Sequence, residues 1–133
     1  MSFINRDQTE PIISDEEMRD LADKFLLAIK LRNWELLRTI ITKDCVWRWP
    51  GDETFSGTAI GADSVIKEIS GVAGRVIDIR LKKISFGLNG VALSLHFHTK
   101  MTGFETDKEL ITVCILRGYQ IAGINTYLST EGL

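Results

Sequence analysis

Residues 44–61 read Asp-Cys-Val-Trp-Arg-Trp-Pro-Gly-Asp-Glu-Thr-Phe-Ser-Gly-Thr-Ala-Ile-Gly, the most informative stretch of the chain. Side chains alternate between the two faces of a strand, so Trp47 and Trp49 share one face. Two neighbouring indole rings are costly to leave in water, so this face is predicted to be core or the wall of a pocket. The Pro-Gly pair at 50–51 ends the strand. Residues 57–61, bounded by glycines, are predicted to form a loop that leads into a helix.

The composition is that of one folded domain. The chain has 133 residues, of which 44% are hydrophobic and 26% charged, and this length is enough for a core without disulfides or metals. The net charge of −2 argues against a nucleic acid or an anionic membrane as the main partner. Cys45 and Cys114 lie in apolar strand patterns and are predicted to be buried free thiols in a reducing compartment.

The sequence shows no targeting signal and no membrane-spanning segment. The N-terminus lacks an apolar segment of signal-peptide length, and no run approaches the ~20 apolar residues of a membrane span. We therefore expect a cytoplasmic protein. The glycines match no phosphate-binding spacing, and no cofactor is expected.

Helices are predicted in the first half of the chain. Residues 1–13 form a polar lead-in, and residues 14–133 form a single domain. Ser14 and Glu17 have the spacing of a capping box, which predicts the start of a helix with apolar residues recurring at helical spacing as far as residue 29. Asn33 is the predicted N-cap of a second helix.

A third helix and then a run of strands complete the predicted order. The helix covers residues 63–70, and Gly71 and Gly74 are expected to stop it. Alternating apolar residues predict strands at 76–81, 91–98, 110–116 and 120–128. A tight hairpin turn is predicted at residues 88–90 and a second turn at 102–107. Helices followed by a meander of strands indicate an α+β fold.

This order resembles the SnoaL-like proteins of the nuclear transport factor 2-like superfamily, which include polyketide cyclases and ketosteroid isomerases. The motif that carries the resemblance is Trp-x-Trp-Pro-Gly-Asp…Ser-Gly-x-x-x-Gly, supported by residues 112–114 and 124–129. The resemblance implies a cone-shaped α+β fold, with three N-terminal helices packed on a curved, mostly antiparallel sheet. It also implies a cavity between the concave sheet face and the first helix, and a homodimer formed through the convex face.

The same resemblance argues against ketosteroid isomerase activity. Those enzymes use a carboxylate base with an oxyanion hole made of a tyrosine and a protonated aspartate. When these enzymes are aligned with the chain at Pro50, their base corresponds to Trp49 and their tyrosine to Phe25. Their aspartate corresponds, less directly, to Thr112. An indole cannot abstract a proton, and a phenyl ring cannot donate a hydrogen bond.

We predict an apolar cavity for a small hydrophobic molecule, because such sites are mostly apolar with a few polar groups. The predicted ligand-binding residues are Phe25, Trp47, Trp49, Leu93, Leu95, Phe97, Thr112 and Cys114. Thr126 is a further candidate for a polar contact. Non-catalytic binding is slightly favoured, and the alternative is an enzyme of the polyketide cyclase, isomerase or hydrolase type.

Three further residues could carry chemistry. Asp52, at the expected cavity mouth, is a candidate base or part of a solvated turn. His96 and His98 share one strand face and are either a proton shuttle or half of a metal site, or else part of a polar convex face. Because the pattern places no carboxylate or cysteine beside both histidines, the polar face is favoured and no metal is expected. His98 remains a weak catalytic candidate.

The convex face is the predicted dimer surface. Ile111, Val113 and Ile115 alternate with inward-facing residues and share the outer face with His96 and His98. Three β-branched side chains on an uncovered face would form an exposed apolar patch, which usually marks a partner surface.

Overall fold

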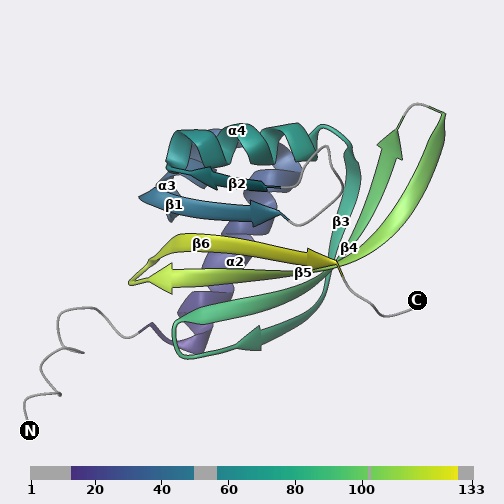
Figure 1. The fold of residues 1–133 in the computed structure, drawn as a ribbon. Helices are drawn as coiled ribbons and strands as arrows, with labels where there is room; N and C mark the ends of the chain where they lie inside the picture. Colours follow the sequence, from purple (N-terminus) through teal and green to yellow (C-terminus); the bar gives the residue numbers. More distant parts are fainter. Residues whose placement is uncertain (1–12, 50–56, 102, 129–133) are drawn as a thin grey trace, which may run out of the picture.

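The computed structural model describes residues 13–49, 57–101 and 103–128, and Figure 1 shows their arrangement. The helices are α2 (Asp15–Leu31), α3 (Trp34–Ile40) and α4 (Ala62–Ala73). The strands are β1 (Ile41–Trp49), β2 (Gly57–Ile60), β3 (Val76–Phe86), β4 (Gly90–Met101), β5 (Phe104–Arg117) and β6 (Gln120–Leu128). Three helices on a curved, mostly antiparallel sheet confirm the predicted α+β fold. None of the helices in these ranges is both long and apolar enough to cross a membrane.

Side-chain caps start the first two helices where the sequence predicts. The backbone N–H of Glu17 donates to Ser14 Oγ at 3.1 Å, and the Ser14 N–H donates to Glu17 Oε1 at 3.0 Å. This reciprocal capping box satisfies two donors that the first helical turn leaves without partners. Asn33 Oδ1 accepts from the Leu36 N–H at 3.1 Å and caps α3.

The segment after the tryptophan strand differs from the sequence prediction in two ways. Gly57–Ile60 is not a loop but strand β2, which pairs antiparallel with β1 and places Ala59 opposite Trp47. Helix α4 also continues through Gly71 to Ala73, with Gly74 as its C-cap. A single glycine costs a helix only about 1 kcal/mol, and the buried positions of α4 outweigh this cost.

The sheet has the strand order β2-β1-β6-β5-β4-β3. All neighbouring strands are antiparallel except β1 and β6, which are parallel. The hairpin of β4 and β5 is longer than predicted, because β4 runs to Met101 and β5 begins at Phe104. Strands β1 and β6, which come from the two halves of the chain, therefore lie side by side inside one sheet.

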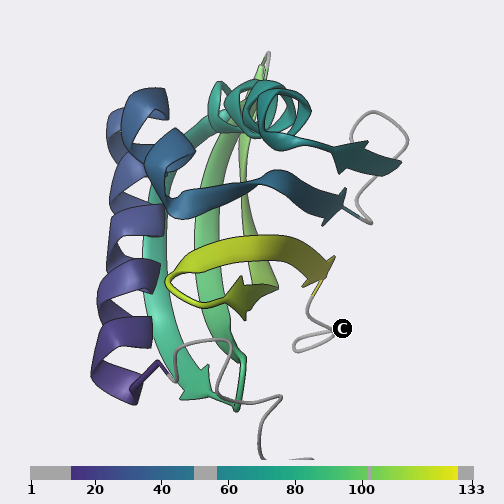
Figure 2. The same ribbon diagram turned by 90° about the vertical axis from the view of Figure 1, so that its left-hand side faces the viewer.

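The sheet curves around the helices and has two different faces. Figure 2 shows α2 lying along the concave face of β3 and β4, with α4 above it. Phe25, Leu93, Leu95 and Ile124 are among the buried residues between these layers. The opposite, outer face is the one seen in front of α2 in Figure 1.

Arg32 joins the ends of two helices to the start of β3. It follows α2 in the left-handed conformation, with φ 52° and ψ 40°. Its Nη2 atom donates to the carbonyl oxygens of Ala73 at 2.8 Å and Val76 at 3.1 Å. A cation that hydrogen-bonds to the last carbonyls of a helix also interacts favourably with the helix dipole.

We predict that Arg32→Ala lowers the free energy of unfolding by about 1–2 kcal/mol, because both guanidinium hydrogen bonds are lost. Arg32→Gly loses the same bonds but removes the left-handed strain, so its cost should be roughly 1 kcal/mol smaller. Urea unfolding measures both values, with Arg19→Ala as a control that removes only an exposed ion pair on α2. Equal losses for the Ala and Gly variants would contradict the role given to the backbone conformation.

Candidate functional site

Two stacked indoles form one wall of a cavity on the inner face of the sheet. Trp47 and Trp49 lie two residues apart on β1, and their ring centroids are 5.7 Å apart with an interplanar angle of 20°. The Trp47 side chain is 3% exposed, whereas Trp49 is partly buried. Pairing of Trp47 with Ala59 on one side and Ile124 on the other fixes its position. Both rings therefore face the cavity, as their spacing predicts.

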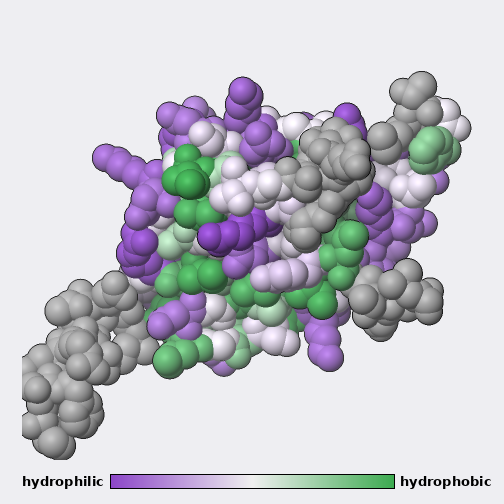
Figure 3. All heavy atoms as spheres, viewed as in Figure 1, coloured by the Kyte–Doolittle hydropathy of each residue, from purple (hydrophilic) through white to green (hydrophobic). Residues whose placement is uncertain are grey.

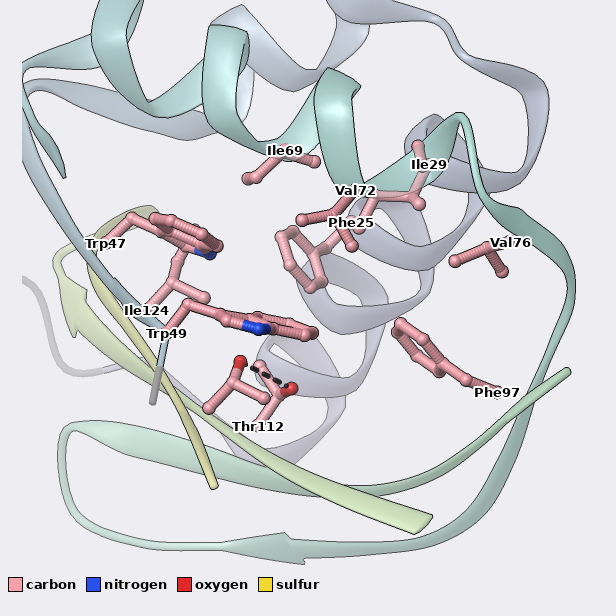
Figure 4. Close-up of a pocket in the computed structure, with 12 residues that line it drawn as sticks. Phe25, Ile29, Trp47, Trp49, Ile69, Val72, Val76, Phe97, Thr112 and Ile124 are labelled. Atoms are coloured by element: carbon pink, nitrogen blue, oxygen red, sulfur yellow. Dashed lines mark hydrogen bonds between the residues drawn. The ribbon is translucent and has the colours of Figure 1, made fainter. Parts of the chain in front are cut away.

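The other walls come from elements far apart in the chain. Phe25 extends from α2 and Phe97 from β4, and both rings are largely buried. Figure 4 shows them opposite the two indoles, with Ile69 and Val72 of α4 above. The described residues that line the cavity are Phe25, Ile29, Trp47, Trp49, Ile69, Val72, Ala73, Val76, Phe97, Thr112, Ile124 and Thr126.

A pair of hydroxyl groups supplies polarity at this apolar site. Thr112 on β5 and Thr126 on β6 are directly paired in the sheet. Their Oγ1 atoms are 3.0 Å apart and hydrogen-bonded to each other, as Figure 4 shows. Each residue is only 3% exposed, so the pair is an internal polar group that the cavity alone can reach.

The cavity is small and carries no charge among its lining residues. Its volume is ≈ 30 Å³, measured as the space open to the centre of a water molecule. One water needs about 10–15 Å³ on this measure, so the space suits a compact molecule of a few heavy atoms. None of the described lining residues is ionisable. The arrangement can therefore enclose a small molecule, but the described lining offers no acid or base.

Some predicted lining residues are in the core instead. Leu93, Leu95 and Cys114 face inward and are fully buried, but they do not border the cavity. Strand alternation fixes the face of a side chain but not its position along the sheet, and these three lie where the layers are closely packed. Asp52 lies outside the described residues.

The cavity residues missed by sequence analysis are mostly aliphatic. Ile69, Val72 and Val76 line it from α4 and the start of β3. The available signal was the spacing of three residues between Ile69 and Val72, which places both on one face of α4; Val76 lies in β3, where helical spacing does not apply. This spacing indicated that the side chains are buried, but not that they border a cavity.

The two cysteines have no catalytic features. Both are free and buried. Burial raises the pKa of the Cys45 thiol to about 11 and that of Cys114 to about 12. The reactive species is the thiolate, so both groups are inert near neutral pH.

A chain of alternating acids and imidazoles lies on the outer face of β4 and β5. We call it the histidine–carboxylate ladder; it contains His96, His98, Glu105, Asp107 and Glu109. His96 Nδ1 is 2.8 Å from Glu109 Oε1, and His96 Nε2 is 3.0 Å from Asp107 Oδ1. His98 Nδ1 is 2.8 Å from Asp107 Oδ1, and His98 Nε2 is 2.9 Å from Glu105 Oε1.

This ladder corrects two expectations. Carboxylates do lie beside both histidines, because the β4–β5 register places His96 opposite Glu109 and His98 opposite Asp107. The His98 side chain points to the other face of the sheet from Phe97 and does not line the cavity. It is therefore no candidate base for a ligand held there. The structure thus places the histidines on the polar convex face.

The ladder favours the charged form of both imidazoles. Each ring has a carboxylate at both nitrogens, and a carboxylate only accepts, so both contacts are satisfied only when the ring is protonated. Hydrogen bonds from Glu109 and then Asp107 raise the pKa of His96, and those from Asp107 and then Glu105 raise the pKa of His98. The histidines in turn lower the pKa of Asp107 and Glu109.

Charged groups on β3 border the ladder. Lys82 Nζ is 3.3 Å from Glu109 Oε1 and further lowers the pKa of that carboxyl group. In the β3–β4 register, Arg80 lies opposite His96 and Asp78 lies opposite His98.

We predict that the ladder stabilises the fold most in mildly acidic solution. The pKa of each histidine is raised above 6.5 on folding, so its contribution is complete below about pH 6.5 and is lost as the pH rises through the folded-state pKa. The pKa values of Asp107 and Glu109 are lowered from 3.8 and 4.5, so their contribution is present above these values and is lost on further acidification.

The measurement compares the parent protein with the double variant His96→Gln/His98→Gln by urea unfolding. The difference in unfolding free energy should decrease between about pH 6 and pH 8.5. Lys24→Gln, which breaks an exposed ion pair with Asp20, should give a difference that stays constant over this range. A constant difference for the histidine variant as well would rule out the charged ladder.

No protein-family model and no curated protein matches the sequence, but many solved structures share its fold. A protein of unknown function with a cystatin-like fold from Xanthomonas campestris has a TM-score of 0.76 and 21% identity, covering 86% of this chain and 92% of its own. A hypothetical protein with a ketosteroid isomerase-like fold from Catenulispora acidiphila, in complex with trimethylamine, has a TM-score of 0.70 and 15% identity, with coverage of 84% and 86%.

A de novo designed protein with a curved β-sheet is equally similar, with a TM-score of 0.72, 17% identity and 90% coverage of both chains. These likenesses show that the chain has the nuclear transport factor 2-like fold, also described as cystatin-like. The presence of a designed chain among them illustrates that the architecture by itself specifies no activity.

Proposed function

We propose that this protein is a non-catalytic binding module, resembling the SnoaL-like proteins, which holds a compact and mostly apolar molecule in the cavity between α2, α4 and the sheet. The observation that carries the proposal is the lining itself. Four aromatic rings and several aliphatic side chains surround the space, and none of the described lining residues is ionisable. The complex of the Catenulispora acidiphila protein with trimethylamine supports it, because a compact molecule is bound there to a protein of the same fold.

The alternative is an enzyme of the cyclase, isomerase or hydrolase type, which would need a base that reaches the cavity. His98 points away from it, and Asp52 lies outside the described residues. Ketosteroid isomerisation is not proposed, since Trp49 and Phe25 stand where that reaction needs a carboxylate and a phenol. The unpaired Cys45 and Cys114 support the proposal of a reducing, cytoplasmic location.

We expect the parent protein to bind xenon, a compact apolar probe of protein cavities, with saturable changes in ¹²⁹Xe chemical shift. Val72→Phe should abolish this binding, because the added ring enters the cavity from α4. Val46→Phe is the matched control, because Val46 is on β1 but does not line the cavity. Failure of the parent protein to bind xenon, or equal binding by the Val72 variant, would refute the assigned site.

We further propose that the protein forms a homodimer through the outer face of the sheet. Ile111 and Ile115 are 39% and 43% exposed on β5, with Val113 between them. Figure 3 views the molecule over β1, β5 and β6 and shows hydrophobic side chains gathered on these strands beside hydrophilic ones. An apolar patch with a polar rim is typical of a protein–protein interface.

Light scattering at micromolar concentration should therefore give the mass of a dimer. Ile115→Glu should shift it to the monomer, because a charge at the centre of the interface would lose its hydration without gaining a partner. Leu31→Glu is the matched control, because Leu31 is 65% exposed at the end of α2, which lies on the concave side of the sheet. A monomeric parent protein, or an undisturbed Ile115 variant, would overturn this interface.

A further inference from the structure

Two of the polar groups around the cavity can only donate hydrogen bonds. An indole N–H can only donate, and two indoles line the space. Trp47 is almost fully buried, and among the described residues neither its N–H nor that of Trp49 has a hydrogen-bond partner. Neither atom is among the fully buried polar atoms that lack a partner, so each N–H keeps open space beside it that an acceptor brought by a ligand can occupy.

The threonine pair adds a further donor. Thr112 and Thr126 carry two O–H groups, and their mutual hydrogen bond uses one of them. Within the described chain the second O–H has no other partner. Figure 4 shows Thr112 near the Trp49 ring. The oxygen atoms of the pair can also accept, whereas the two indole N–H groups can only donate.

A cation is a poorer match for this lining. No carboxylate lines the cavity among the described residues, so a bound ammonium ion would lose its hydration without gaining a counter-charge. Trp47 and Trp49 also stack on each other, so one face of each indole is covered and cannot receive a cation. A cation would then depend on the other indole faces and on Phe25 and Phe97, and phenyl rings attract cations less strongly than indole does.

We infer that the cavity binds a compact molecule without net charge that carries a hydrogen-bond-accepting oxygen. The oxygen meets the indole N–H groups and the free hydroxyl of the Thr112–Thr126 pair, while the apolar body contacts Phe25 and Phe97. This inference rests on the proposed binding function and adds to it the polarity of the ligand.

Two probes of the same tetrahedral shape distinguish a site for a neutral acceptor from a site for a cation. Trimethylamine N-oxide has no net charge and carries an accepting oxygen, whereas tetramethylammonium is a cation without an acceptor. The indole ¹H–¹⁵N signals of Trp47 and Trp49 report directly on hydrogen bonding, and that of Trp34, which does not line the cavity, is the internal control. The signals are assigned with single Trp→Phe variants.

The N-oxide should shift at least one cavity indole signal downfield in a saturable way, with an affinity at least about tenfold above that of tetramethylammonium. Thr112→Val and Thr126→Val keep the side-chain shape and should weaken N-oxide binding about fivefold. Thr58→Val on the exposed surface of β2 should not change it. The dispersed indole signals show in the same spectrum that each variant is folded.

Equal or tighter binding of tetramethylammonium would overturn the inference in favour of a cation site. An equal shift of Trp34, or none at either cavity indole, would overturn it as well. If xenon still binds in those cases, only the polarity is wrong and the proposed binding function stands. If xenon does not bind, the proposed function itself fails.

Discussion

The parallel pairing of β1 with β6 is the contact on which the rest of this structure depends. It joins residues 41–48 to residues 121–125, across almost the whole sequence. Strand β2 is attached to β1 on one side of this contact, and β5, β4 and β3 follow β6 on the other. Without it, Trp47 would have no Ile124 beside it, and the indole wall would not face the threonine pair. The site therefore forms only when the two halves of the chain have joined in one sheet.

Strand alternation then divides the functions of β4 and β5 between two environments. Phe97 faces the cavity, while His96 and His98 on either side of it face outward. Thr112 faces inward, while Ile111 and Val113 lie on the outer face. Neighbouring residues of one strand thus contribute to two separate surfaces, and a register slip of one residue would exchange them.

The sequence predicted those parts of the fold that depend on local chemistry. Ser14 and Asn33 cap helices where their side chains predict, and the spacing of Trp47 and Trp49 placed both on the inner face. Strand β2 was missed because the three residues between Gly57 and Gly61 carry too little pattern to distinguish a short edge strand from a loop. The carboxylates of the ladder were missed because they depend on the β4–β5 register, which the length of the turn between the strands sets.

The ladder gives the outer face a graded rather than a sharp response to protons. Asp107 Oδ1 contacts both imidazoles, so the two rings share one counter-charge and repel each other when both are protonated. Loss of the first proton removes this repulsion, and the Asp107 carboxylate then interacts with only one imidazolium. The pKa of that remaining imidazolium is therefore raised further. The macroscopic pKa values belong to the pair and move apart. The surface charge of the sheet therefore changes over a wider pH interval than one isolated histidine would cover.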